Sequence, residues 1–278
     1  MKKCSNFVAA MKNRIFFVLL CLIGMSMYSV PAFSWGQEGH RVIAKIAYDN
    51  LTPKARKSVD KILGKRGIIY WSNWADEIKS DNIYPQSIKD GWHYQNLASG
   101  LSDSAIVAMV MDCPKVNGRL FSVHDSLVYN MAAERVYDSN RDHTLRFIVH
   151  LSGDLYCPMH MGRKEDQGGN LIPMEWFGKP TNLHEVWDDK LIESQGYSYS
   201  EYAQIIEDTY APLKREIEQR SEAQLLLDNY HFTESIYAYQ QVWDGNTYHY
   251  IYTWHELMEK QLYVAGIRLA KLLNEMFQ

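Results

Sequence analysis

Apolar residues recur every three or four positions through most of the chain, the spacing that places them on one face of a helix. The first such run covers residues 42–47. A second begins at Thr52-Pro53, where threonine can cap a helix that starts with proline, and it ends at Leu63 before Gly64. The pattern therefore predicts two helices in this region.

The same spacing continues toward the C-terminus. It predicts further amphipathic helices at 142–157, 200–219, 233–243 and 253–276. Thr253 and Glu256 form a capping-box pattern that would start the last of them. Strand-like alternation is nearly absent, and only Ile172–Phe177 fits one arm of a short hairpin. Because no linker or repeat divides the chain, we expect a mostly α, single-domain, multi-helix fold.

The first 34 residues follow a different pattern. Basic residues precede an apolar run over 15–28, and residues 32–34 (Ala-Phe-Ser) fit the small-x-small motif that signal peptidase cuts. The run is short for a transmembrane helix, although an uncleaved membrane anchor is the alternative. We therefore expect a signal peptide at 1–34 and a mature domain at 35–278, secreted or periplasmic. Cleavage would give Trp35 a free α-amino group.

Charge and cysteine content narrow the class of protein. The formal net charge is −4, from 29 basic and 33 acidic residues; the leader holds four basic and no acidic residues, which leaves −8 after cleavage. An acidic protein is a poor non-specific binder of nucleic acid, so a phosphate site would need local positive charge such as metal ions. Cys113 and Cys157 are the cysteines beyond the leader. They could form one disulfide in an oxidising compartment, and neither has zinc-finger spacing.

Histidine and aspartate recur four residues apart at two places, His150 with Asp154 and His184 with Asp188. Such residues share one helix face, where imidazole and carboxylate can bind one zinc ion. An ordinary surface hydrogen bond is the alternative for each pair. Similar apolar surroundings contain three further candidate ligands: Asp76, His93 and His160. Five histidines without a matching partner are expected to be structural or surface residues: His124, His143, His231, His249 and His255.

A set of motifs occurs in order between Trp35 and Lys190, about two thirds of the mature chain. They read WGQEGHRVIAKIA, WADEIK, HYQN, LRFIVHLSGDLYCPMHMG, GGN and NLHEVWDDK. Together they resemble the secreted zinc-dependent single-strand nucleases of the S1/P1 type, which are related to bacterial zinc-dependent phospholipases C. The resemblance implies the mostly α fold of these enzymes, with a cleft that holds three zinc ions.

Carried over residue by residue, the resemblance implies three ligand sets for Zn²⁺. The first consists of Asp76, His93, His150 and Asp154, the second of His160, His184 and Asp188, and the third of Trp35, His40 and the shared Asp154. Trp35 would bind through its α-amino nitrogen and carbonyl oxygen, so signal cleavage would complete the site. Residue 35 could instead be only a buried aromatic near a terminus.

The resemblance also implies an activity, that of an endonuclease and 3′-nucleotidase which cleaves single-stranded DNA and RNA to products with 5′-phosphates. Asp76 would orient the attacking water, and Lys79 would lie near the scissile phosphate unless it is a solvated helix lysine. Tyr94 and Asn96 would bind a base. Relatives often have Asp in place of Asn96, so base preference does not carry over. They also differ at Asp189, so a substrate role for that residue does not carry over, and they usually have a polar residue in place of Cys157.

Two other functions fit parts of the same pattern. A phospholipase C would use a similar metal scaffold on lipid head groups, although that group tends to have Glu as its last ligand rather than Asp188. The second alternative is a non-catalytic binding protein stabilised by zinc. The ligand set argues against it, because a structural zinc site needs no open trinuclear cluster. We expect single-stranded nucleic acid and nucleotides as substrates, no membrane association after cleavage and no obligate protein partner.

Overall fold

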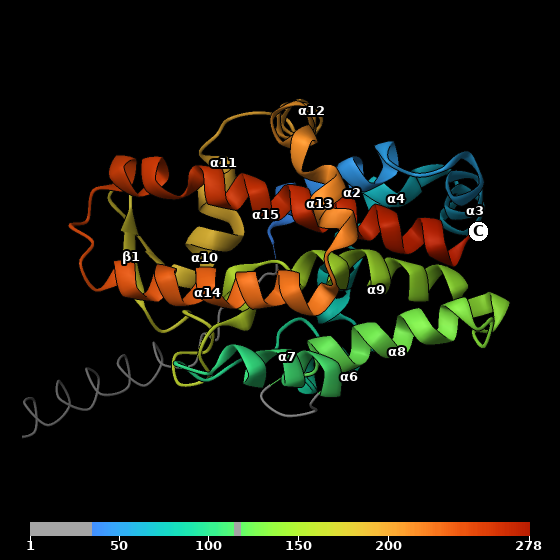
Figure 1. Cartoon of the computed structure of the whole chain (residues 1–278), viewed down its shortest axis with the longest axis horizontal. Helices are drawn as coiled ribbons and strands as arrows, with labels where there is room; N and C mark the ends of the chain where they lie inside the picture. The colour runs from blue at the N-terminus through green and yellow to red at the C-terminus, as the bar shows by residue number, and fades with distance from the viewer. Residues whose placement is uncertain (1–34, 114–117) are drawn as a thin grey trace, which may run out of the picture. The chain divides into compact units, whose positions relative to one another are not determined.

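Helices make up most of the computed structural model, which describes residues 35–113 and 118–278 (Figure 1). The signal peptide expected at 1–34 lies outside the described residues. The first part of the described chain contains α2 (Gln37–Asp49), α3 (Pro53–Leu63), α4 (Gly67–Trp71), α5 (Trp74–Glu77), α6 (Pro85–Lys89), α7 (Asp103–Asp112), α8 (Leu120–Ala132) and α9 (Arg141–Asp154).

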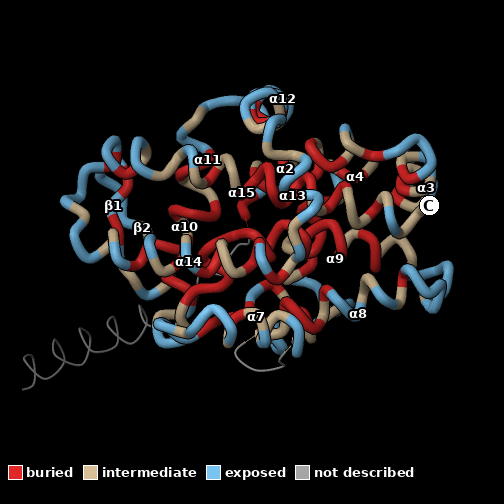
Figure 2. The backbone as a smooth tube through the Cα atoms, in the orientation of Figure 1, coloured by how far each residue is buried: buried red, intermediate tan, exposed pale blue. Residues whose placement is uncertain are grey.

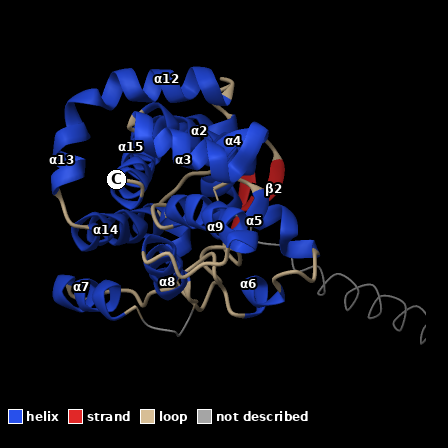
Figure 3. Ribbon diagram, turned by 90° about the vertical axis from the view of Figure 1, so that its right-hand side faces the viewer, coloured by secondary structure: helices blue, strands red, loops and turns tan. Residues whose placement is uncertain are grey.

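The second part begins with an antiparallel hairpin of β1 (Pro173–Trp176) and β2 (Lys179–Asn182), in which Pro173 pairs with Asn182 and Trp176 with Lys179. It continues with α10 (Leu183–Glu185), α11 (Leu191–Glu193), α12 (Tyr199–Tyr210), α13 (Lys214–Gln219), α14 (Glu222–Gln240) and α15 (Thr247–Met276). Figure 3 shows the strands beside a body of helices. The mostly α, single-domain prediction is confirmed. No helix among the described residues is long and apolar enough to cross a membrane.

Helix α9 lies at the centre of the packing. The long helix α15 packs along α2, and both helices contact α9, which is covered on another side by α8. Figure 2 shows the backbone of α9 and the middle of α15 mostly as buried, whereas α8 and α12 have exposed faces. Nearly every α9 residue from Thr144 to Asp154 is buried. Polar side chains on this helix therefore need partners inside the protein.

Several predicted elements have the expected boundaries. Thr52 Oγ1 accepts a hydrogen bond from the Ala55 N–H at 3.2 Å, so threonine caps α3. Gly64 follows α3 with φ +68°, a left-handed conformation that glycine adopts without strain. The stripe at 142–157 corresponds to α9, and Ile172–Phe177 supplies β1.

The predicted start of the last helix is wrong. Helix α15 begins at Thr247, where Asn246 caps it by accepting a hydrogen bond from the His249 N–H at 3.2 Å. Thr253 lies inside the helix and donates its hydroxyl to the His249 carbonyl, so it forms no capping box with Glu256. Burial of Tyr250 against the core favours the longer helix.

Two further boundaries differ from the prediction. The helix expected at 233–243 is α14, which begins at Glu222 because Ser221 and Gln224 form a capping box. The helix expected at 200–219 is interrupted after Tyr210 by a tight turn with proline inside it. Proline removes a backbone donor, so the chain continues as the separate helix α13.

Candidate metal centre and active site

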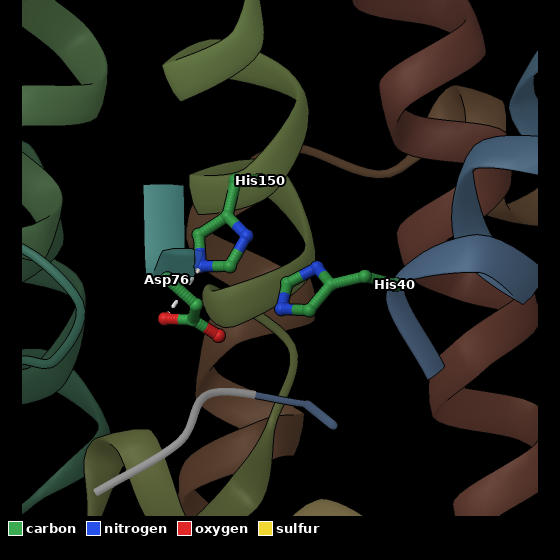
Figure 4. Close-up of side chains that lie close together, drawn as sticks. All are labelled: His40, Asp76 and His150. Atoms are coloured by element: carbon green, nitrogen blue, oxygen red, sulfur yellow. Dashed lines mark ion pairs between the residues drawn. The ribbon is translucent and has the colours of Figure 1, made fainter. Parts of the chain in front are cut away.

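Helix α9 presents two candidate ligands on its inner face. His150 and Asp154 are fully buried, and His150 Nε2 lies 3.5 Å from Asp154 Oδ2. Gly153 lies between them, and a Cβ added there would approach His40 Nδ1 to 2.9 Å. Glycine therefore lets the His40 ring, from α2, stack on the His150 ring with centroids 3.9 Å apart (Figure 4).

Asp76 and His93 complete a first cluster around His150. Asp76 Oδ1 lies 3.4 Å from His150 Nε2 and 3.6 Å from His93 Nδ1. His93 Nδ1 is in turn 3.2 Å from His150 Nε2. Figure 4 shows the Asp76 carboxylate below the His150 ring, with His40 approaching from the other side. The fold thus brings together imidazole and carboxylate groups from three separate segments, which are the donor types that zinc binds.

Asp154 connects this first cluster to His40 and His160. Its Oδ2 atom faces His93 Nδ1 at 3.2 Å, whereas its Oδ1 atom faces His40 Nε2 at 3.4 Å and His160 Nδ1 at 3.8 Å. The two oxygens of one carboxylate therefore point at different groups of histidines. This division is the geometry that a carboxylate needs to bridge two metal ions.

A second cluster lies around Asp188, in the π-helical turn Val186–Lys190. Its Oδ2 atom is 3.0 Å from His184 Nε2, and its Oδ1 atom is 3.7 Å from His160 Nε2. The His160 and His184 rings stack with centroids 5.3 Å apart. Cys157 belongs to the same cluster, because its Sγ atom donates to Asp188 Oδ1 at 3.3 Å.

Backbone carbonyls fix the orientation of two of these rings. His150 Nδ1 is 2.7 Å from the Ser72 carbonyl oxygen, and His184 Nδ1 is 2.7 Å from the Gly168 carbonyl oxygen. Each Nδ1 must carry its proton to donate this hydrogen bond. The Nε2 lone pair is then directed into the cluster, as in metal-binding histidines whose other nitrogen is held by the protein.

The electrostatics of the clusters favour a bound cation. Burial alone would raise the pKa of Asp154, but His150 and His160 hold that pKa well below its ordinary value. Burial, together with the charge of Lys79, lowers the pKa of His93 to about 4, so the ring is neutral near pH 7. The buried cluster atoms that form no hydrogen bond within the described chain include Asp154 Oδ1, Asp188 Oδ2 and His160 Nδ1. Ionised carboxylates and neutral imidazoles fit metal ions.

Comparison with known proteins agrees with this geometry. The model of the S1/P1 nuclease family matches residues 35–278. The chain belongs to this family. It is 30% identical over 272 residues to Endonuclease 3 of Arabidopsis thaliana, in an alignment that covers 88% of this chain and 90% of that relative. It is 29% identical over 189 residues to Nuclease S1 of Aspergillus oryzae, covering 66% of this chain and 62% of that relative. The protein is therefore a nuclease.

The first described residues of the nuclease lie against its candidate metal-binding clusters. Trp35 is fully buried, and the next residue, Gly36, donates its N–H to the Asp188 carbonyl at 2.7 Å. The Gly36 carbonyl accepts from the His40 N–H at 3.2 Å. A Cβ on Gly36 would lie 1.4 Å from Asp189 Oδ1, so only glycine permits this approach. The segment that begins at Trp35 is thus anchored beside two predicted ligands.

Lys79 is paired inside the site rather than solvated. Its Nζ atom lies 2.5 Å from Asp76 Oδ1, and about 11% of its side chain is exposed. Burial alone would raise the pKa of Asp76, but the charges of His150 and Lys79 hold that pKa well below its ordinary value. The lysine therefore keeps the carboxylate ionised and places a positive charge at the rim of the first cluster.

Tyr94 and Asn96 lie on a segment that runs beside the second cluster. The Gln95 N–H, between them, donates to the His160 carbonyl at 2.9 Å. Tyr94 remains partly exposed, with 37% of its surface accessible, whereas Asn96 is buried. Gly118 approaches Tyr94 so closely that a Cβ would lie 2.8 Å from the ring. The arrangement leaves an aromatic ring accessible next to a buried amide.

A cavity of about 650 Å³ opens beside the first cluster, and Asp76 and Gly36 contribute to its wall. Asp189 lines the same cavity. Burial, with the neighbouring charge of Asp188, raises the pKa of Asp189 to about 7. The cavity has the size of pockets that accept small organic ligands.

Sequence reasoning missed the contact of Cys157 with Asp188. Its position three residues before His160 was the available signal. Cys113 and Cys157 are both free, so the disulfide considered above does not form between them. The five histidines expected to be structural or surface residues lie outside the groups in the described ranges that could hold a metal ion. Of these, His124 pairs with Ser152 Oγ at 2.9 Å within the core.

Proposed function

We propose that this nuclease is a zinc-dependent endonuclease and 3′-nucleotidase, which hydrolyses single-stranded DNA and RNA to products bearing 5′-phosphates. The observation that supports this activity best is the division of Asp154 between His93 on one oxygen and His40 and His160 on the other. A buried carboxylate shared in this way suits a cluster of metal ions that activates water beside a phosphodiester.

Nine residues would bind three zinc ions in this proposal: Trp35, His40, Asp76, His93, His150, Asp154, His160, His184 and Asp188. Bound zinc would acidify a water molecule and supply the positive charge that an acidic chain otherwise lacks near a phosphate. The stacking of His40 on His150 and the position of Gly36 beside Asp188 support a compact cluster.

The side chains around the cluster would position the reactants. Asp76, kept ionised by Lys79, would accept a hydrogen bond from the attacking water and hold its proton. The ammonium of Lys79 would also approach the phosphate. This double role explains why the lysine is mostly buried although its charge must be desolvated.

The partly exposed ring of Tyr94 supports the preference for single strands. An aromatic face binds any base by stacking, but only if that base is not already stacked in a duplex. Asn96 would then hydrogen-bond to the base edge, where its amide offers both a donor and an acceptor. The pair predicts broad base tolerance combined with discrimination against double-stranded substrates.

Signal cleavage after Ser34 would complete the active site. The α-amino nitrogen of Trp35 gains a lone pair for metal binding on cleavage, whereas a peptide nitrogen has none to donate. Secretion or export to the periplasm and assembly of the site would therefore be coupled. The anchoring of Gly36 on Asp188 supports this proposal, because it holds the new terminus beside the cluster.

Hydrolysis by protein expressed from the full chain tests the proposal. Its N-terminus is determined by mass spectrometry, and zinc is counted by elemental analysis. Single-stranded DNA, duplex DNA, RNA, 3′-AMP and phosphatidylcholine are then compared as substrates. We expect Trp35 as first residue, about three zinc ions per chain, cleavage of single strands and 5′-phosphate products.

Asp154→Asn is the matched variant, with Asp142→Asn on the same helix as its control. Asp142 is partly exposed and pairs with Arg146, so its loss should leave hydrolysis unchanged. Asp154→Asn should lose both metal and activity. Cleavage of the lipid without cleavage of nucleic acid would indicate a phospholipase C instead. Full zinc occupancy without turnover of any substrate would refute the proposed activity.

A further inference from the structure

Cys157 is a fully buried thiol between two groups of candidate ligands. It lies three residues after the end of α9 and directly before the turn Pro158–Met161, which contains His160. Its Sγ atom donates a hydrogen bond to Asp188 Oδ1 at 3.3 Å. The thiol, a His160 ring nitrogen and an Asp188 oxygen all lie within 4.8 Å of one another. None of the roles described above accounts for this contact.

The two oxygens of Asp188 have different surroundings. Oδ1 receives the thiol hydrogen of Cys157, whereas Oδ2 lies 3.0 Å from His184 Nε2 and is buried without a hydrogen bond of its own within the described chain. A carboxylate held at one oxygen cannot rotate freely about its Cβ–Cγ bond. The thiol therefore aims the other oxygen at the point that His184 also faces.

The backbone holds Cys157 in place from both sides. Its N–H donates to the Asp154 carbonyl at 3.1 Å, and its carbonyl accepts from the His160 N–H at 3.1 Å. Asn229, on α14, donates through Nδ2 to the Cys157 carbonyl at 3.4 Å, and its Oδ1 atom accepts from Gln261 Nε2 at 2.9 Å. The thiol thus has a fixed position relative to the centre of the fold.

We propose that Cys157 is a positioning residue of the second metal site, in which its S–H group orients Asp188 for metal binding. This inference rests on the proposed function for its catalytic consequence, but the orientation itself concerns only metal affinity. A direct Cys157 sulfur–metal bond is a different arrangement. It would close the site with a fourth protein ligand and leave no open position for substrate.

Metal affinity of protein expressed from the full chain tests the role, with Zn²⁺ titrated against a chelator. Cys157→Ala removes the donor and should weaken the binding of one zinc ion by about 10- to 100-fold, the usual effect of losing a group that orients a ligand. Cys157→Ser keeps a donor at the same position and should restore most of the affinity. Cys113→Ala is the control, since Cys113 is outside the cluster and should not matter.

Cobalt substitution separates the two arrangements. The wild-type protein loaded with Co²⁺ should show no sulfur-to-cobalt charge-transfer absorption, because the thiol stays protonated on Asp188. Such a band, lost in Cys157→Ser, would establish direct ligation and overturn the proposal. Equal losses of affinity in the serine and alanine variants would also overturn it, since they would indicate packing alone. A zinc affinity of Cys157→Ala equal to that of the wild type would also overturn it.

These readouts do not depend on substrate. If the wild-type protein binds zinc and the variants behave as expected, but no nucleic acid is cleaved, the proposed function fails and the positioning role stands. If hydrolysis is confirmed while Cys157→Ala binds zinc normally, the positioning role fails and the proposed function stands.

Discussion

Gly153→Ala tests whether close packing on α9 controls the metal cluster. The new Cβ would lie 2.9 Å from His40 Nδ1 and 3.1 Å from Cε1, whereas ordinary contacts begin near 3.4 Å. His40 is almost completely buried and stacks on His150, so its ring cannot turn into open space. Either the ring or the helix must therefore move by about 0.5 Å, the shortfall in the closer contact.

Stability and function should respond differently to this change. Alanine gains about 1 kcal/mol over glycine in a helix interior, whereas overpacking a core costs about 1–3 kcal/mol. The free energy of unfolding should therefore fall by at most about 2 kcal/mol, combining these two magnitudes. A displacement near 1 Å in an active site can reduce the rate by about 100-fold, so we expect a 10- to 100-fold loss in kcat/KM.

The assay measures zinc per chain, kcat/KM on single-stranded DNA and urea unfolding for the same preparations. Gly266→Ala is the control, because its Cβ would clash with Ile46 Cγ2 at 2.5 Å and not with a ligand. The control should lower stability and retain its zinc. Gly153→Ala with normal zinc content and normal kcat/KM would refute the reasoning that the glycine sets the position of His40.

Three further predictions concern single groups. Asp189→Asn should stabilise the protein more at pH 8 than at pH 5, by about 1–2 kcal/mol of unfolding free energy. The reason is that the pKa of Asp189 is raised to about 7, so its ionisation destabilises the fold as pH rises through about 4–7. The full effect would be about 4 kcal/mol, and partial exposure of the carboxylate reduces it. Urea unfolding at both pH values measures this, and equal gains would contradict it. The unfolding free energy of the metal-free protein should fall by up to about 3 kcal/mol as pH falls from 6.5 to about 4, because the pKa of His93 is about 4 in the folded chain and its protonation favours unfolding. Thermal unfolding of the wild type and of His93→Gln across this pH range would measure the contribution of His93. Tyr94→Ala should raise KM for single-stranded DNA about 10- to 100-fold through lost stacking, with hydrolysis of a small phosphodiester that lacks bases as the unaffected control.

The sequence predicted the ligand pairs because helix periodicity fixes them. His150 and Asp154 lie on one face of α9 wherever the helix is placed, and His184 faces Asp188 for the same reason. Local capping chemistry similarly predicted the start of α3 at Thr52. These features depend on residues a few positions apart, so no knowledge of tertiary packing was needed.

Features set by long-range contact were not predictable in this way. The thiol of Cys157 meets Asp188 across 31 positions of sequence, and its place three residues before His160 does not identify Asp188 as the partner. The start of α15 was predicted too late because burial of Tyr250, rather than a local cap at Thr253, decides how far the helix extends. The meeting of Asp76 and His93 with His150 came from family resemblance and not from spacing.

The charges of the clusters indicate how metal ions and protons would compete. Burial opposes protonation of His150, but the carboxylates of Asp154 and Asp76 outweigh it and raise the pKa of that ring. The pKa values of His40 and His93 are lowered instead, first by burial and then by neighbouring positive charge. His150 is thus the ring that takes a proton as pH falls, and since its Nε2 faces Asp76, metal binding there must release that proton. Zinc affinity of the first cluster should accordingly rise with pH through the titration of His150.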